Sequence, residues 1–213
     1  MTEIRIMTRL LPLLRALICL FLTFGILGCP STSPTRFFVL HPLVDIRVTS
    51  PDGERGPHIC VGPVEIPEYL NQPEIVTRVS TSEIKVHDFA EWAEPLEDSI
   101  SHTIAENLSA SLCTRTVDVF PCEGQSLLGY QVEIRVIQMD GTLGETASLK
   151  VSWSIFDGGD QKRPVVLSKR SNYEEALNRK GYEAFVSAQS RLLASLSCDI
   201  AEAVCRMEET QKK

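Results

Sequence analysis

Cysteine is the residue type whose placement carries the clearest chemistry in this sequence. Cys29 ends the segment Ile26-Leu27-Gly28-Cys29, in which aliphatic and small residues lead to a cysteine. This pattern is typical of a lipobox, where the cysteine thiol accepts diacylglycerol before the chain is cleaved in front of it. Buried acyl chains contribute about 0.8 kcal/mol per methylene, so two or three of them hold a folded domain at a membrane surface. The pattern therefore predicts Cys29 as a lipidated N-terminus.

The residues before Cys29 have the order of parts of a signal peptide. Three arginines come first, an apolar run over 16–27 follows, and the polar segment 30–35 comes after the cysteine. The run is shorter than the roughly 20 apolar residues that a membrane-spanning helix needs. We therefore predict a signal peptide over 1–28 and a lipidated N-terminus with a tether over 29–35; the sequence leaves open whether translation begins at Met1 or Met7. An extended tether from Cys29 to residue 37 reaches at most about 28 Å, so the domain works close to its membrane.

Five further cysteines enter an oxidising compartment with the exported chain: Cys60, Cys113, Cys122, Cys198 and Cys205. An odd number cannot pair completely, so at most two disulfides form within the chain. Cys198 and Cys205 share a face of a predicted helix about 10 Å apart, which is too far for a bond between them. Cys113 with Cys122 is the preferred pair, because a helix end followed by a short strand can bring these two backbones together.

Other residue types form no recognisable catalytic, metal or nucleotide motif. The sequence has no GxSxG, and its SxxK match begins at Ser82 in a predicted strand, where Ser82 and Lys85 would point to opposite faces. Phosphate-binding glycine loops and CxxC pairs are also absent. Four histidines are scattered without the spacing of a base or a metal ligand: His41, His58, His87 and His102. The sequence therefore predicts a protein that is not an enzyme and that takes no cofactor or metal.

Charge and length narrow the class further. Removing the leader takes Arg5, Arg9, Arg15 and Glu3 from totals of 21 basic and 28 acidic residues, which leaves 18 and 27 and a formal charge near −9. No basic stripe with interleaved aromatic residues occurs, so nucleic acid is excluded as a main partner. The remaining length is enough for one domain with a real core.

Two long helices are predicted from apolar side chains that recur on one face. The first begins at Pro95, a favoured first helical position, and the second runs over 181–209. Residues 75–79 and 83–87 are predicted as a hairpin, and 130–136 and 147–155 as antiparallel strands joined around Asp140-Gly141. Short strands are expected at 36–40, 60–64, 117–120 and 165–170. This order predicts the α/β (α+β) class: a single two-layer domain over 36–209, with both helices packed on a mixed or mostly antiparallel sheet.

Two stretches resemble a known family. They are 61–78, VGPVEIPEYLNQPEIVTR, and 92–96, WAEPL, followed by 104–108, IAENL. Together they resemble the ABC-type transport auxiliary lipoprotein family, the PqiC-like proteins, and the resemblance extends over the 36–40 strand, the strand with Trp153 and the 182–201 helix. The sequence departs from the family where Asn71-Gln72 replaces a common acidic-arginine pair and in its additional cysteines.

The resemblance implies a non-catalytic lipoprotein on the periplasmic face of the outer membrane. Such proteins work with an MCE-domain protein and an ABC permease and ATPase, which move lipids or hydrophobic solutes between the two membranes. Pro30, in place of an aspartate after the lipidated cysteine, is compatible with passage to the outer membrane in enteric-type sorting. The alternative is a structural or assembly lipoprotein that stabilises an envelope complex without handling lipid.

A proline-bracketed loop over 67–73 is the predicted contact with a partner, either the MCE protein or a neighbouring copy in a homo-oligomeric ring. Its two prolines reduce the entropy lost when the loop is held rigid, and Tyr69 and Leu70 could anchor a partner there. Trp92 is a third candidate. The alternative is that Tyr69 and Leu70 fold back on the core, and that Trp92 fills the seam at the start of the helix.

Overall fold

The computed structural model describes residues 33–43, 57–112, 117–122, 129–158 and 164–211. Thr35–Lys213 forms one compact unit. Within the described residues, no helix combines the length and the apolar character that crossing a membrane requires. The predicted signal peptide, Cys29 and most of the tether lie outside the described residues, so they stay predictions.

A mixed five-stranded sheet forms the centre of the unit, in the order β5-β2-β6-β7-β8. Its strands are β2 (Ile59–Glu65), β5 (Val117–Val119), β6 (Tyr130–Thr142), β7 (Thr146–Asp157) and β8 (Val165–Ala176). β2 runs parallel to both β5 and β6, whereas β7 runs antiparallel to both β6 and β8. The predicted alternation along β7 is confirmed, because every second side chain from Ala147 to Ile155 is buried.

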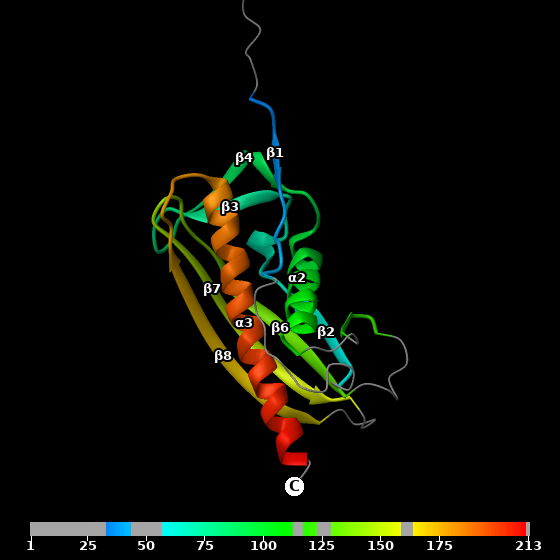
Figure 1. Cartoon of the computed structure of the whole chain (residues 1–213). Coiled ribbons are helices and arrows are strands. Elements are labelled where there is room, and N and C mark those ends of the chain that lie inside the picture. The colour runs from blue at the N-terminus through cyan, green and yellow to red at the C-terminus, as the bar shows by residue number, and fades with distance from the viewer. Residues whose placement is uncertain (1–32, 44–56, 113–116, 123–128, 159–163, 212–213) are drawn as a thin grey trace, which may run out of the picture. The chain divides into compact units, whose positions relative to one another are not determined.

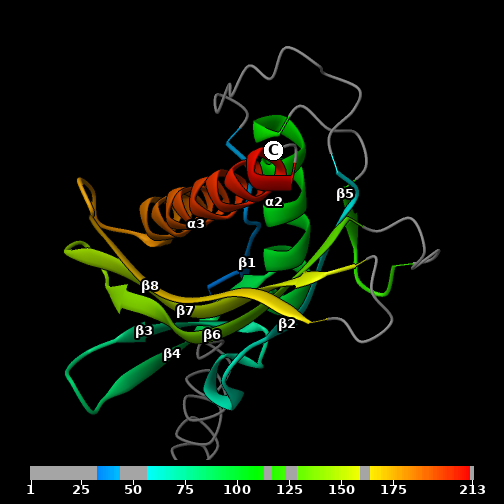
Figure 2. The same ribbon diagram turned by 90° about the horizontal axis from the view of Figure 1, so that it is seen from below.

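Two helices lie on one face of this sheet, α2 (Leu96–Ser111) and α3 (Tyr182–Gln211) (Figure 2). Pro95 precedes the first residue of α2 instead of occupying it. Gly181 precedes α3 with a φ of 125°, a conformation that side chains with a Cβ rarely adopt. The predicted class, two helices packed on a mixed sheet in an α+β arrangement, is confirmed.

A second sheet of three strands, β1-β4-β3, lies at the end of the unit where α3 begins (Figure 1). It consists of β1 (Arg36–Phe38), β3 (Glu74–Arg78) and β4 (Ile84–Trp92), with the predicted β3–β4 hairpin and with β1 parallel to β4. The ring of Tyr182 on α3 packs in a tilted arrangement against Phe38 and edge-on against His87, with ring centroids 5.7 Å and 5.0 Å away. The predicted single sheet is therefore divided in two.

The predicted turn at Asp140-Gly141 is wrong, because both residues lie inside β6 and the chain turns over 143–145. Gly141 has a φ of 152°, and a Cβ there would collide with the backbone of Thr146 on β7. The glycine therefore permits close approach of two strands within the sheet. Asp140 is fully buried instead of exposed in a turn.

The predicted disulfide between Cys113 and Cys122 is also wrong, because Cys122 is bonded to Cys60 across a Cα–Cα distance of 6.1 Å. The reason is the parallel pairing of β5 with β2, in which Cys60 lies opposite Asp118. After β5 the chain bends at Phe120 and Pro121 instead of continuing along β2, so Cys122 lies beside Cys60. Cys113 lies outside the described residues, and Cys198 and Cys205 are both free.

Candidate functional site

The loop over 67–73 is ordered by its own hydrogen bonds. Glu68–Leu70 forms one turn of 3-10 helix, η1, in which the Leu70 N–H donates to the carbonyl of Pro67 at 2.9 Å. The Gln72 side-chain amide donates to the carbonyl of Tyr69 at 2.8 Å. This turn directs Leu70 into the core, where it is 3% exposed. Leu70 therefore does not present its side chain to a partner, and the alternative in which it folds back on the core is correct.

Trp92 is also a core residue, with 7% of its surface exposed. It ends β4 and lies opposite Phe38 of β1, on the face of the small sheet that also buries Ala90. The backbone N–H of Trp92 donates to the carbonyl of Pro73 at 2.7 Å, which joins the end of the loop to β4. The strand register places this indole inward, so the prediction that Trp92 contacts a partner is wrong.

Tyr69 lies partly exposed above a buried carboxylate. Its hydroxyl donates to Oδ2 of Asp140 at 3.2 Å. Burial, followed by the nearby Asp140 charge, raises the pKa of Tyr69 to about 12. The phenol is therefore held neutral as a donor, so the hydroxyl that could have contacted a partner is already engaged within the domain.

Asp140 is the centre of a polar cluster that the sequence did not predict. Arg78 donates to it through Nε and Nη2, with Nη2 at 2.6 Å from Oδ2, and Gln138 donates to Oδ1 at 2.6 Å. The Asp140 side chain is 0% exposed and that of Arg78 is 27% exposed. We name Tyr69, Arg78, Gln138 and Asp140 the Asp140 cluster. Because its members come from η1, β3 and β6, it fastens the loop and the β3–β4 hairpin to the five-stranded sheet.

The strongest candidate for a contact surface is an exposed apolar face on β1 and β4, which we name the β1–β4 face. Phe37 is 64% exposed, although Phe38 and Leu40 beside it are buried. β4 does not alternate strictly, but it also leaves large apolar side chains outside the core. The members of this face are Phe37, Val39, Ile84, Val86 and Phe89. Large exposed apolar side chains on and beside two neighbouring strands make this part of the surface a candidate site of contact with another molecule.

Three of the four histidines lie beside polar side chains of other segments of the fold. The two ring nitrogens of His87 lie 2.8 Å from the Thr77 hydroxyl and 2.9 Å from the Tyr182 hydroxyl. Burial, together with the charge of Lys85, lowers the pKa of His87. The other three lie elsewhere: His41 beside Ser190, His58 beside Asp118, and His102 exposed on α2. Within the described part of the chain, no group of three or more His, Cys, Asp and Glu side chains could hold a metal ion.

Two crystal structures share this fold. One, of an uncharacterized protein, is 18% identical with a TM-score of 0.65, and the match covers 81% of this chain and 99% of that one. The other, of a protein from Xanthomonas campestris, is 14% identical with a TM-score of 0.69, and the match covers 84% and 100% of the two chains. At these identities the likeness shows the fold alone. No curated protein matches the chain in sequence.

A family model described as the ABC-type transport auxiliary lipoprotein component matches residues 38–201. The match includes the loop over 67–73, both helices up to residue 201 and every strand of the five-stranded sheet. It covers more than half of the sequence. The chain therefore belongs to the ABC-type transport auxiliary lipoprotein family, as an auxiliary component of ABC-type transport.

Proposed function

We propose that this protein is a non-catalytic lipoprotein subunit of an ABC/MCE-type system that moves lipids or other hydrophobic solutes between the inner and outer membranes. The observation that carries this proposal is the family match over residues 38–201. In the proposal, lipidated Cys29 anchors the domain to the periplasmic face of the outer membrane. The acidic exported chain and the lipobox at 26–29 are consistent with this role.

A subunit without chemistry of its own acts by contact, and the β1–β4 face is the surface proposed for that contact. Phe37 follows the proposed lipidation site by only eight residues in the sequence, so a short tether keeps β1 close to the membrane that holds the lipid anchor. The partner is the MCE-domain protein, or a neighbouring copy of this chain if the subunits form a ring. Aromatic residues are enriched among those that contribute most to protein contacts, which makes Phe37 and Phe89 the residues to test.

The test is a Phe37→Ser/Phe89→Ser double variant of the full chain, expressed in cells that contain the MCE and ABC subunits. Phe37 is 64% exposed and Phe89 is 48% exposed, so we expect the melting temperature to stay close to that of the wild type. Ile137→Ser/Val165→Ser is the matched control, because it removes two exposed apolar side chains from β6 and β8. We expect the Phe variant, and not the control, to recover less MCE protein on affinity purification.

Three further measurements distinguish the possible partners and roles: the mass of the lipoprotein assembly, the transfer of lipid, and the integrity of the MCE/ABC complex. The mass of the purified lipoprotein assembly shows whether the contact is made with another copy of this chain. Transfer of radiolabelled phospholipid between the two membranes tests the transport role. Normal lipid transfer together with a dispersed MCE/ABC complex in cells lacking this lipoprotein would favour the structural or assembly role. Equal partner recovery and equal assembly mass in the Phe and control variants would exclude the β1–β4 face as the contact.

A further inference from the structure

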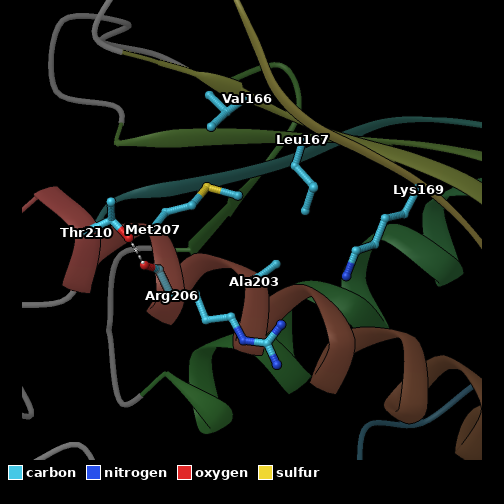
Figure 3. A pocket seen from close by; sticks show the side chains of 7 residues that line it. All are labelled: Val166, Leu167, Lys169, Ala203, Arg206, Met207 and Thr210. Atoms are coloured by element: carbon cyan, nitrogen blue, oxygen red, sulfur yellow. Dashed lines mark hydrogen bonds between the residues drawn. The ribbon is translucent and has the colours of Figure 1, made fainter.

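An apolar cleft of about 450 Å³ lies between the beginning of β8 and the last turns of α3 (Figure 3). Leu167 of β8 and Met207 of α3 extend into the space between strand and helix, with Val166 and Ala203 beside them. The volume lies within the range of about 300 to 1,000 Å³ that is typical of small-molecule sites. The cleft is separate from both the Asp140 cluster and the β1–β4 face.

The cleft forms where the side chains that lie between β8 and α3 become smaller. Further along β8, the Tyr173 hydroxyl donates to Asp199 of α3 at 2.5 Å, so a large side chain fills the space there. Toward the end of the helix, α3 presents Ala203 instead, and the methyl group of an alanine cannot reach the strand. β8 is the edge strand of its sheet, so no further strand covers this side.

Two cationic side chains lie at this apolar cleft. Lys169 extends from β8 toward α3, with its ammonium 5.6 Å from the centroid of the Trp153 ring (Figure 3). Arg206 lies one turn after Glu202 and forms an ion pair with it, which occupies one nitrogen of the guanidinium and leaves further N–H donors. In the described part of the chain, Lys169 has no carboxylate partner. The cleft therefore combines an apolar interior with positive charge at its margin.

Three carboxylates of α3 in this region already have donors. Asp199 accepts from Tyr173, Glu202 pairs with Arg206, and Glu208 accepts from the Tyr130 hydroxyl at 2.9 Å. None of the three forms an ion pair with Lys169. Positive charge at an apolar cleft is notable in an exported chain with a formal charge near −9, because most of its surface disfavours anions.

We propose that this cleft binds a single acyl chain that carries an anionic head group, such as a fatty acid or a lysophospholipid. The acyl chain would lie against Leu167, Ala203 and Met207, and Lys169 with Arg206 would bind the carboxylate or phosphate. The assignment builds on the proposed function, because it gives the transport subunit a ligand of its own. The binding assay needs no transporter, so the two proposals can fail separately.

The test uses the full exported chain with Cys29→Ser, which has no acyl chains of its own. The probe is 11-(dansylamino)undecanoic acid, an anionic acyl chain whose fluorescence increases in apolar surroundings. Palmitate and lysophosphatidylglycerol then serve as anionic competitors, and palmitic acid methyl ester serves as the neutral one. We expect saturable binding with one probe per chain, and displacement by either anionic competitor at a concentration at least tenfold lower than by the ester.

Two variants and a control locate the site. Lys169→Gln/Arg206→Gln should weaken probe binding at least tenfold, which corresponds to about 1.4 kcal/mol. Val166→Glu adds a negative charge at a half-exposed position and should weaken it similarly without loss of fold. Lys150→Gln/Arg170→Gln removes the same charge from positions opposite Asn172 and Ser152, on the other face of the sheet, and should bind as the wild type does.

Several results would overturn the assignment. They are the absence of saturable binding, equal affinity in the Lys169/Arg206 variant and its control, and equal competition by the ester and the acids. Displacement by palmitate alone or by lysophosphatidylglycerol alone would support the site and identify the head group. Loss of probe binding with normal recovery of the MCE partner would leave the contact through the β1–β4 face intact.

Discussion

Replacement of Arg78 by methionine is the most direct test of what holds the β3–β4 hairpin and η1 to the main sheet. In the wild type, the guanidinium donates to both carboxylate oxygens of Asp140, whose side chain is fully buried. Arg78→Met keeps most of the aliphatic bulk but leaves a buried carboxylate with only Tyr69 and Gln138 as donors. Breaking a buried ion pair by removing one partner usually costs about 3 to 5 kcal/mol.

We expect the lower end of that range, about 3 kcal/mol, because Arg78 is 27% exposed and water screens part of the interaction. For a domain of this size, that loss corresponds to a melting temperature lower by about 6 to 12 °C. Asp140→Asn should cost less, about 2 kcal/mol, since the remaining guanidinium can reach solvent. The double variant should cost clearly less than the sum of the two single variants, because both remove the same interaction.

Urea unfolding with the disulfide intact measures these free energies. Arg135→Met is the control, because Arg135 pairs with Glu65 at a site where both side chains are more than half exposed. It should cost under about 0.5 kcal/mol. Hydrogen exchange over 68–92 should accelerate in Arg78→Met and not in the control. Additive costs in the double variant, or a loss below about 1 kcal/mol in Arg78→Met, would refute the role assigned to the Asp140 cluster.

Three further predictions concern other parts of the molecule. Cys29→Ser should leave the precursor unprocessed or mislocalised, as measured by membrane fractionation and intact mass; a variant with the wild-type mature mass in the outer membrane would disprove lipidation at Cys29. Cys60→Ser/Cys122→Ser should lower the free energy of unfolding by about 4 kcal/mol, because the bond closes a loop with a sequence separation of 62. Cys113→Ser should change the melting temperature little. A large loss of stability in Cys113→Ser, with little loss in the double variant, would instead show that Cys113 forms the disulfide. The pKa of Tyr69 is raised from 10.0 in the unfolded chain to about 12, so its contribution to stability is complete below pH 10 and is lost as pH rises from 10 toward 12. The melting temperature of the wild type should therefore fall more steeply between pH 10 and 11 than that of Tyr69→Phe, and parallel curves would contradict this linkage.

The elements of this fold could be predicted because their signals are local. The apolar stride of α2 and α3 and the alternation of β6 and β7 each repeat within a few residues, and each is determined by which side chains leave water. The β3–β4 hairpin was predicted for the same reason. Where the local signal was ambiguous, the prediction failed: Asp140-Gly141 has the composition of a turn but lies inside β6.

The candidate sites depended on pairings that no local pattern specifies. Arg78 and Asp140 are 62 residues apart in the sequence, as are Cys60 and Cys122, and each pair meets only because distant strands come together. Leu70 and Trp92 could equally have been exposed anchors until η1 and the register of β4 turned them inward. The cleft between β8 and α3 likewise follows from an alanine opposite an edge strand.

The sequence by itself determined the lipobox pattern, the helices, most strands and the resemblance to the family, because each depends on residues that are close together along the chain. Only the tertiary structure decided which cysteines bond, which apolar residues stay exposed and where positive charge meets an apolar cleft. The physical reason is that burial and pairing depend on all the elements packed around a side chain. The type of a residue and its neighbours in the sequence specify only which local structure that residue favours.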